Sequence, residues 1–427
     1  MAERSFLGDM LTTLFERRRG TASGDDGRSI EDMCTALLDA EGEISGMALA
    51  QAILDRYESL SDDERLSFFK FLNSSLEIDP SALEEAIATY RDTQATKDYR
   101  RIGQLAEPRR QELFRRLNQP PGATFALVNM RTDLLKVVKK DPELARTDLD
   151  FQHLLRSWFN RGFLVLRQIS WETPASILEK IVEYEAVHAI HDWGDLRRRL
   201  YPQDRRCFAF FHPSMPDEPL IFVEIALTMN VPDSIQRVLA DDREHRDAFE
   251  TKVAVFYSIS NCQSGLRGIS FGNLLIKQVV SELQQELPGL ETFVTLSPIP
   301  ELRRWARENP AEPAADALMN EEGDPDGIQQ AAVDYLLTAK APDGKPFDPV
   351  ARFHLGNGAQ IWAVHGAADL SDNGIAQSGG AMVNYHYDLN LIEQNHERFV
   401  QEGEIATSPG FRPSLSNARK RRRAQAS

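Results

Sequence analysis

The chain is poor in cysteine and has no long apolar run. Its 427 residues include only Cys34, Cys207 and Cys262, far apart and without a C-x-x-C pair, so neither a disulfide framework nor a paired-cysteine zinc site is indicated. We expect reduced thiols in a cytoplasmic protein, with Cys262, beside a glycine-rich loop, as the one candidate for oxidation. No run of about 18 apolar residues occurs, so no membrane span is predicted.

Positive charge is also in deficit. The formal net charge is −16, which argues against nucleic acid as the main partner. The basic run at residues 419–423 is interpreted as a solvated tail, with a nucleic-acid or localisation role as the lesser alternative. Residues 1–20 combine a short amphipathic pattern with acidic side chains, which is not typical of a targeting signal. Hydrophobic content of 42% and charged content of 27% are those of a globular protein, long enough for two domains.

Several familiar site signatures are missing. The glycine-rich stretch around Gly265, Gly268 and Gly272 is not a P-loop, because Asn273 stands where lysine is needed, and it is not the dinucleotide pattern G-x-G-x-x-G. The serine in Leu-Ser297-Pro-Ile-Pro does not lie in G-x-S-x-G. A serine hydrolase that forms an acyl-enzyme is therefore not supported.

Cap chemistry recurs through the first part of the chain. Helix starts at Ser29, Ser61 and Ser81 match S-x-x-[DE], where the serine bonds free backbone N–H groups of the first turn. Prolines and glycines separate the amphipathic runs between them. We predict an all-α bundle over residues 1–159. It holds no compact set of catalytic residue types, so we expect a structural or oligomeric role.

The second part alternates between strand-like and helical patterns. Apolar runs at 163–169, 207–211 and 220–228 are typical of strands. The most informative stretch, residues 253–300, predicts a strand, the glycine-rich loop, a helix and a second strand. A helix that begins after glycines offers free N–H groups to a phosphate; a tight turn with close packing is the equally weighted alternative. The acidic, Pro- and Ala-rich segment 307–344 is interpreted as a surface insertion.

Two polar residues stand at positions suited to a site. Ser297 follows a predicted strand, at the carboxyl edge where ligands bind in open α/β sheets, although it could simply cap a turn. His354 lies between prolines and a Gly-Asn turn, and we expect it in a loop at a site mouth or as an ordinary loop histidine. Together they could bind a carboxylate and move one proton. His188 and His191 are three apart on an expected helix, where a solvated face is favoured over a metal site.

Several motifs together resemble the malonyl-CoA decarboxylase family. They are YSISNCQSGLRGISFGNLLIKQVV, TFVTLSPIP, FHLGNGAQIW, GGAMVNYHY and WETPASILEKIVEYEAVHAIHDW. The resemblance implies an α+β two-domain fold, with a helical oligomerisation domain over 1–159 and an α/β N-acetyltransferase-like, acyl-CoA-binding domain over 160–427. It implies conversion of malonyl-CoA to acetyl-CoA and CO2 by a homo-oligomer, without metal and with no cofactor beyond the CoA of the substrate.

The resemblance also assigns residues. Ser297 becomes the proton acceptor and His354 the proton donor. The malonyl-CoA-binding loop falls on Arg267, Gly268, Ile269, Ser270, Phe271, Gly272 and Asn273, with Ser270 in place of the family's acidic residue. Asn384 and Tyr385 are further candidates for substrate contact, with core packing as the alternative for Tyr385. An acyl-CoA N-acyltransferase and a non-catalytic acyl-CoA-binding scaffold stay open as rival functions.

Overall fold

The computed structural model describes residues 27–269, 272–312, 314–319 and 324–411. The chain divides into two compact units. The helical unit comprises Met1–Phe163, Pro213–Met215 and Gln263–Ile269, and the sheet unit comprises Leu164–His212, Pro216–Cys262 and Ser270–Ser427. The amphipathic pattern at 1–20, Ser270, Phe271 and the basic run 419–423 lie outside the described residues.

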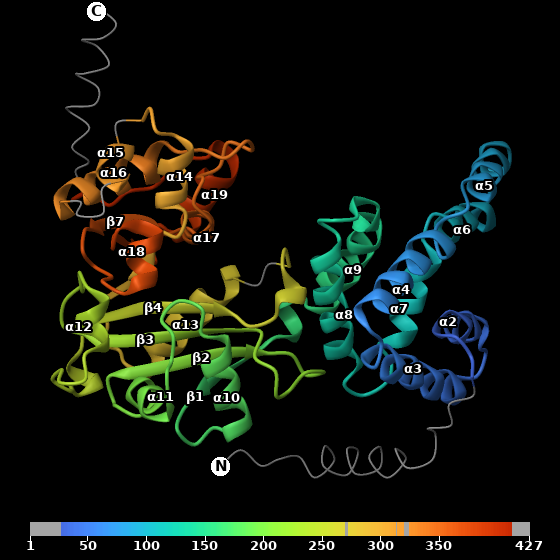
Figure 1. Ribbon diagram of the computed structural model, residues 1–427, viewed down its shortest axis with the longest axis horizontal. Coiled ribbons are helices and arrows are strands. Elements are labelled where there is room, and N and C mark those ends of the chain that lie inside the picture. Colours follow the sequence, from blue (N-terminus) through green and yellow to red (C-terminus); the bar gives the residue numbers. More distant parts are fainter. Residues whose placement is uncertain (1–26, 270–271, 313, 320–323, 412–427) are drawn as a thin grey trace, which may run out of the picture. The chain divides into compact units, whose positions relative to one another are not determined.

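Short helices build the helical unit, as predicted (Figure 1). They are α2 (Ile30–Asp39), α3 (Glu43–Glu58), α4 (Asp62–Ser75), α5 (Pro80–Thr93), α6 (Thr96–Leu105), α7 (Arg109–Leu117), α8 (Ala123–Val137), η1 (Pro142–Leu144), α9 (Ala145–Trp158) and η2 (Arg161–Phe163). Aromatic packing marks the core: Phe114 of α7 stacks on Phe151 of α9 with ring centroids 4.0 Å apart. Buried Arg110 pairs with Asp150, so the positive charge of its guanidinium is compensated inside this core.

The predicted caps are correct at two of three helix starts. Ser29 accepts a bond from the backbone N–H of Asp32, and Ser61 forms a capping box with Glu64. At the third start the prediction is wrong, because Asp79 rather than Ser81 caps α5. Asp79 precedes a proline in the first turn of the helix, and its carboxylate accepts from two backbone N–H groups. An aspartate before a proline that begins a helix is the stronger signal.

The sheet unit follows a strand order of β1-β2-β3-β4-β5-β8-β6, with β7 on β8. Its strands are β1 (Val165–Ile169), β2 (Arg205–Phe211), β3 (Ile221–Thr228), β4 (Val253–Asn261), β5 (Thr292–Thr295), β6 (Ser297–Pro298), β7 (Gln360–His365) and β8 (Met382–His386). Strands β1 to β4 are antiparallel neighbours, whereas β4 and β5 are parallel and are joined through α13 (Gly272–Glu286). A helical region is thus followed by a mixed-sheet domain, and the two-part α+β fold is confirmed.

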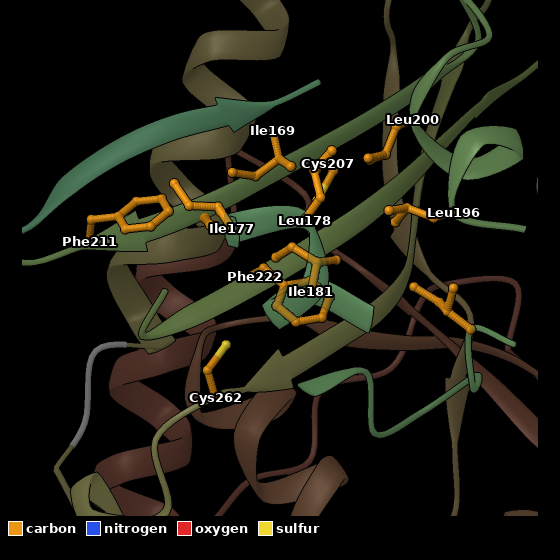
Figure 2. Packing of buried hydrophobic residues seen from close by; sticks show 12 residues of the cluster. Ile169, Ile177, Leu178, Ile181, Leu196, Leu200, Cys207, Phe211, Phe222 and Cys262 are labelled. Carbon is orange, nitrogen blue, oxygen red and sulfur yellow. The ribbon is translucent and has the colours of Figure 1, made fainter. Parts of the chain in front are cut away.

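The sheet unit also contains helices (Figure 1). They are α10 (Ala175–Tyr184), α11 (Trp193–Leu200), α12 (Ile235–Leu239), η3 (Ala248–Glu250), α14 (Leu302–Glu308), α15 (Ala315–Met319), α16 (Pro325–Thr338), α17 (Pro349–Gly356), α18 (Asp372–Ser378) and α19 (Ile392–Glu402); η4 (Ser264–Leu266) belongs to the helical unit. Figure 2 shows Leu178 and Ile181 of α10 packed with Cys207 and Phe222 of the sheet. Cys262 is buried in this cluster, which contradicts the lesser hypothesis that it is accessible to oxidation.

The segment 307–344 is not a surface insertion. It holds α15 and α16, and α16 buries Ile328, Ala331, Ala332, Tyr335 and Leu336. These positions follow helical spacing, but prolines, glycines and acidic residues around them obscure the pattern. Asp324 caps α16 and Pro325 occupies its first turn, so residues interpreted as loop punctuation serve as a helix start. Within the described residues no helix is long and apolar enough to cross a membrane.

Candidate active site

Ser297 lies at the end of the parallel strand pair. Strand β5 ends at Thr295, and after Leu296 the short strand β6 begins with Ser297 and pairs with β8. The Ser297 hydroxyl lies 2.9 Å from Thr295 Oγ1, to which it donates, and 3.1 Å from His354 Nε2. Its side chain is almost fully buried. Ser297 thus follows a strand, as the sequence predicted, and it lies beside His354.

His354 stands in the last turn of α17, not in a loop as expected. Asp348 caps this helix by accepting from the backbone N–H groups of Val350 and Ala351 at 2.9 and 3.0 Å. Pro349 then occupies the first turn. The residues interpreted as a proline-rich approach are thus a helix start. Because α17 is short and capped, the direction of His354 is set by the helix.

Two tyrosines complete the surroundings of His354. Its Nδ1 lies 2.7 Å from the hydroxyl of Tyr387. Its ring stacks on Tyr385, with centroids 4.6 Å apart and planes 22° from parallel. Tyr387 was missed at the sequence level, although residues two apart in an extended run share a face, which places it beside Tyr385. The Tyr385 hydroxyl is buried and has no hydrogen-bond partner within the described residues.

Burial controls the protonation of this pair. Desolvation lowers the pKa of His354 to about 3, so the imidazole is neutral at pH 7 and carries one ring proton. Burial also raises the pKa of Tyr387 well above its usual range, so its hydroxyl stays protonated. A neutral imidazole between two hydroxyls can accept at one nitrogen and donate at the other. The arrangement can therefore pass a proton between His354 and Ser297.

Asn384 and Tyr385 occupy neighbouring positions of β8. Asn384 is fully buried, and its amide Nδ2 donates to the backbone oxygen of Thr295 at 2.8 Å. The same nitrogen donates to Pro232 O at 3.3 Å, and Asn384 Oδ1 lies 2.6 Å from His365 Nε2. All the polar atoms of this amide are thus occupied. Tyr385 contributes its ring to the stack on His354.

The glycine-rich loop is held in place by the helical unit. Buried Arg131 of α8 donates to the backbone oxygens of Gly265 and Arg267, at 2.5 and 2.9 Å, and pairs with Asp148. A Cβ on Gly265 would lie 2.0 Å from the backbone oxygen of Val128, so only glycine fits this approach. The tight-turn alternative therefore accounts for Gly265.

The other residues of the glycine-rich loop differ in their burial and backbone conformation. Arg267 is exposed, Ile269 is buried, and Gly268 has a φ of 81°, which suits glycine. Gly272 and Asn273 begin α13. These observations do not test the predicted malonyl-CoA-binding loop, which stays a prediction.

The histidine pair at 188 and 191 is not on a helix. Helix α10 ends at Tyr184, and Glu185 turns the chain by accepting from the backbone N–H groups of Val187 and His188 at 2.8 Å each. His188 is buried, whereas His191 is exposed. In the described part of the chain no group of three or more His, Cys, Asp or Glu side chains is arranged to hold a metal ion.

Fold and site together define a two-part α+β protein that holds a buried serine–histidine pair in its sheet unit. Comparisons with known proteins identify the family. The profile of the malonyl-CoA decarboxylase N-terminal domain matches residues 76–159, and that of the C-terminal domain matches residues 162–326 and 325–425. The chain belongs to the malonyl-CoA decarboxylase family.

Individual relatives agree. The mitochondrial malonyl-CoA decarboxylase of Anser anser anser is 34% identical over 351 residues, which are 72% of this chain and 69% of the relative. The crystal structure of malonyl-CoA decarboxylase from Rhodopseudomonas palustris is 48% identical with a TM-score of 0.84, and covers 89% of this chain and 97% of that one. The corresponding structure from Agrobacterium vitis is 48% identical with a TM-score of 0.83, at 89% and 98% coverage.

Proposed function

We propose that this chain converts malonyl-CoA to acetyl-CoA and CO2 without a metal ion, with Ser297 and His354 as the catalytic pair. The observation that carries the proposal is the buried 3.1 Å contact between Ser297 Oγ and His354 Nε2. Membership of the malonyl-CoA decarboxylase family supports the choice of substrate. A non-catalytic acyl-CoA-binding protein would have no need of this pair, and against an N-acyltransferase the pair stands in place of an evident amine-deprotonating site.

Decarboxylation requires that CO2 leaves and that one proton is delivered to the product. The bond between Cα and the carboxylate carbon breaks, and its electron pair passes into an enolate whose charge lies on the thioester oxygen. Fixed donors at that oxygen stabilise such charge by several kcal/mol. Cα then takes a proton. A neutral His354 that donates through Nε2 can pass a proton through Ser297 to Cα, and water restores it. Tyr387 supports this order, because its protonated hydroxyl can donate to Nδ1.

Substrate contacts follow from the same surroundings. We propose that Arg267, Gly268, Ile269, Ser270, Phe271, Gly272 and Asn273 form the malonyl-CoA-binding loop. The start of α13 at Gly272 supports this, because backbone N–H groups at a helix N-terminus attract phosphate. The unpartnered hydroxyl of Tyr385 supports a contact with substrate, since a buried donor without a partner costs free energy until one arrives.

A direct test measures products from the purified full chain. With malonyl-CoA in excess EDTA, we expect equal amounts of CO2 and acetyl-CoA. Ser297→Ala is expected to abolish both, whereas Ser281→Ala, at an exposed serine of α13, should leave the rate unchanged. Loss of activity in EDTA, restored by a divalent ion, would refute metal independence. Binding of malonyl-CoA without CO2 release would favour the acyltransferase or scaffold alternatives.

We further propose that residues 1–159 form an oligomerisation domain and residues 160–427 the catalytic domain. Family profiles that end at 159 and resume at 162 support this boundary. Helices α5 and α6 support self-association: each buries a single residue, whereas Ile87 and Tyr99 are 40% and 65% exposed. We also propose a cytoplasmic location, with which the free thiols of Cys34, Cys207 and Cys262 agree.

Light scattering tests the oligomer. The full chain is expected to be larger than a monomer, and Ile87→Glu with Tyr99→Glu should reduce its mass while circular dichroism stays unchanged. A monomeric full chain would refute self-association, and an unchanged oligomer in the double variant would move the interface away from α5 and α6.

A further inference from the structure

Thr295 links Ser297 to the interior of the sheet unit. It is the last residue of β5 and is fully buried. Its Oγ1 accepts the Ser297 hydroxyl at 2.9 Å and the backbone N–H of Tyr385 at 3.1 Å. A serine side chain has three staggered positions. Bonds to Thr295 Oγ1 and His354 Nε2 together select one of them.

Asn384 is hydrogen-bonded to the backbone of Thr295. Its Nδ2 donates to the backbone oxygens of Thr295 at 2.8 Å and Pro232 at 3.3 Å. Two carbonyl partners on one end identify that end as the NH2 group, so the other end is the acceptor Oδ1. Because both ends are occupied and the side chain is fully buried, the amide is positioned to hold Thr295 rather than to bind substrate.

His365 closes the chain of hydrogen bonds. Its Nε2 lies 2.6 Å from Asn384 Oδ1. Since Oδ1 can only accept, Nε2 carries the proton. His365 is the last residue of β7 and is partly exposed. It lines a cavity of about 510 Å³ together with Ser234, Arg237 and Gln329. This series of hydrogen bonds therefore connects the wall of a solvent-facing cavity to the buried Ser297 hydroxyl.

We propose that Thr295, Asn384 and His365 are positioning residues that hold the Ser297 hydroxyl in its reactive orientation during decarboxylation. The inference rests on the proposed role of Ser297. Loss of the His365 donor would leave Asn384 Oδ1 buried without a partner and free the amide to turn away from Thr295. Ser297 would then gain other rotamers. The change acts on the proton step and leaves the acyl-CoA contacts alone.

The test compares kcat and KM for malonyl-CoA in four variants of the full chain. His365→Leu and Thr295→Val should each lower kcat about 10- to 100-fold, the cost of a small misplacement of a reacting group, with KM within about twofold of wild type. His365→Gln, which keeps an N–H donor, and Thr295→Ser, which keeps the hydroxyl, should restore most of the rate. A purely structural role would instead lower the melting temperature and raise KM without this rescue.

The double variant His365→Leu/Thr295→Val decides whether the residues act through one path. If they do, its kcat is no lower than that of Thr295→Val alone. Effects that multiply, or a His365→Leu variant with wild-type kcat, would overturn the proposal. Should His365→Leu fail to fold, the difference between Thr295→Val and Thr295→Ser gives the same decision.

The failure of this inference differs from failure of the proposed function. Ser297→Ala with full activity would refute the function and the inference together. An inactive Ser297→Ala beside fully active His365→Leu and Thr295→Val would refute the positioning role alone.

Discussion

The protonation of His354 predicts a measurable pH dependence of folding. Burial lowers its pKa to about 3 in the folded protein, whereas a histidine in an unfolded chain titrates near 6.5. Because the pKa of His354 is lower in the folded protein, the unfolded chain binds a proton between these two pKa values and the folded protein does not. The stability contributed by the neutral form is complete above about pH 6.5 and is lost as pH falls toward the folded pKa.

The size of the effect follows from the two pKa values. Each pH unit below the unfolded pKa costs about 1.4 kcal/mol for one such group. Between pH 7 and pH 5, His354 therefore removes about 2 kcal/mol from the free energy of unfolding. The His354→Gln variant has no imidazole at this position, so its free energy of unfolding does not fall for this reason. The variant should consequently lose about 2 kcal/mol less than wild type over the same interval, whatever its stability at pH 7.

Urea unfolding at pH 7 and pH 5, followed by tryptophan fluorescence, measures the difference. Other titratable groups are common to both proteins and cancel in the comparison. Ser297→Ala is the matched control, because it removes the neighbouring hydroxyl but leaves the imidazole buried, and it should retain the wild-type pH dependence. Equal losses in wild type and His354→Gln would mean that folded His354 takes up a proton above pH 5, which would refute the neutral buried pair.

Other predictions concern the supports of the fold. Asp348→Ala should destabilise the protein by about 0.5–2 kcal/mol through loss of the α17 cap and lower kcat, whereas Asp348→Asn should retain both; equal activity of the two would contradict the role of the cap. Gly265→Ala should lower the melting temperature because its Cβ meets backbone, while Gly103→Ala, in open space on α6, should raise stability by about 0.5–1 kcal/mol. Arg199→Met should cost about 1.5–3 kcal/mol, because it removes the bond to buried Glu224 together with those to Asp195 and the backbone oxygen of His188; an unchanged free energy of unfolding would contradict this role.

How far the sequence could predict the fold depended on the range of the signal. Local signals were sufficient for the helical bundle, for the strand–loop–helix–strand unit and for the position of Ser297 at a strand end. The caps at Ser29 and Ser61 followed from side-chain chemistry within one helical turn. These features depend on neighbours in sequence.

Features set by tertiary contacts were predicted less well. The helix that carries His354 spans only Pro349–Gly356, too short for a periodic pattern, and its start was interpreted as a loop. The roles of Thr295 and Tyr387 depend on contacts with Ser297 and His354 across the sheet. Such partners are far apart in the chain, so spacing does not predict them. The resemblance to the family pointed to Ser297 and His354 but not to the residues that hold them.

The kcat of three variants at saturating malonyl-CoA tests the central claim most directly: Ser297→Ala, His354→Asn and the double variant, each checked for folding. If the two side chains act as one unit, each single variant loses about 100-fold or more, and the double variant is no slower than the slower single variant. Single variants that keep wild-type kcat, or losses that multiply in the double variant, would contradict the account.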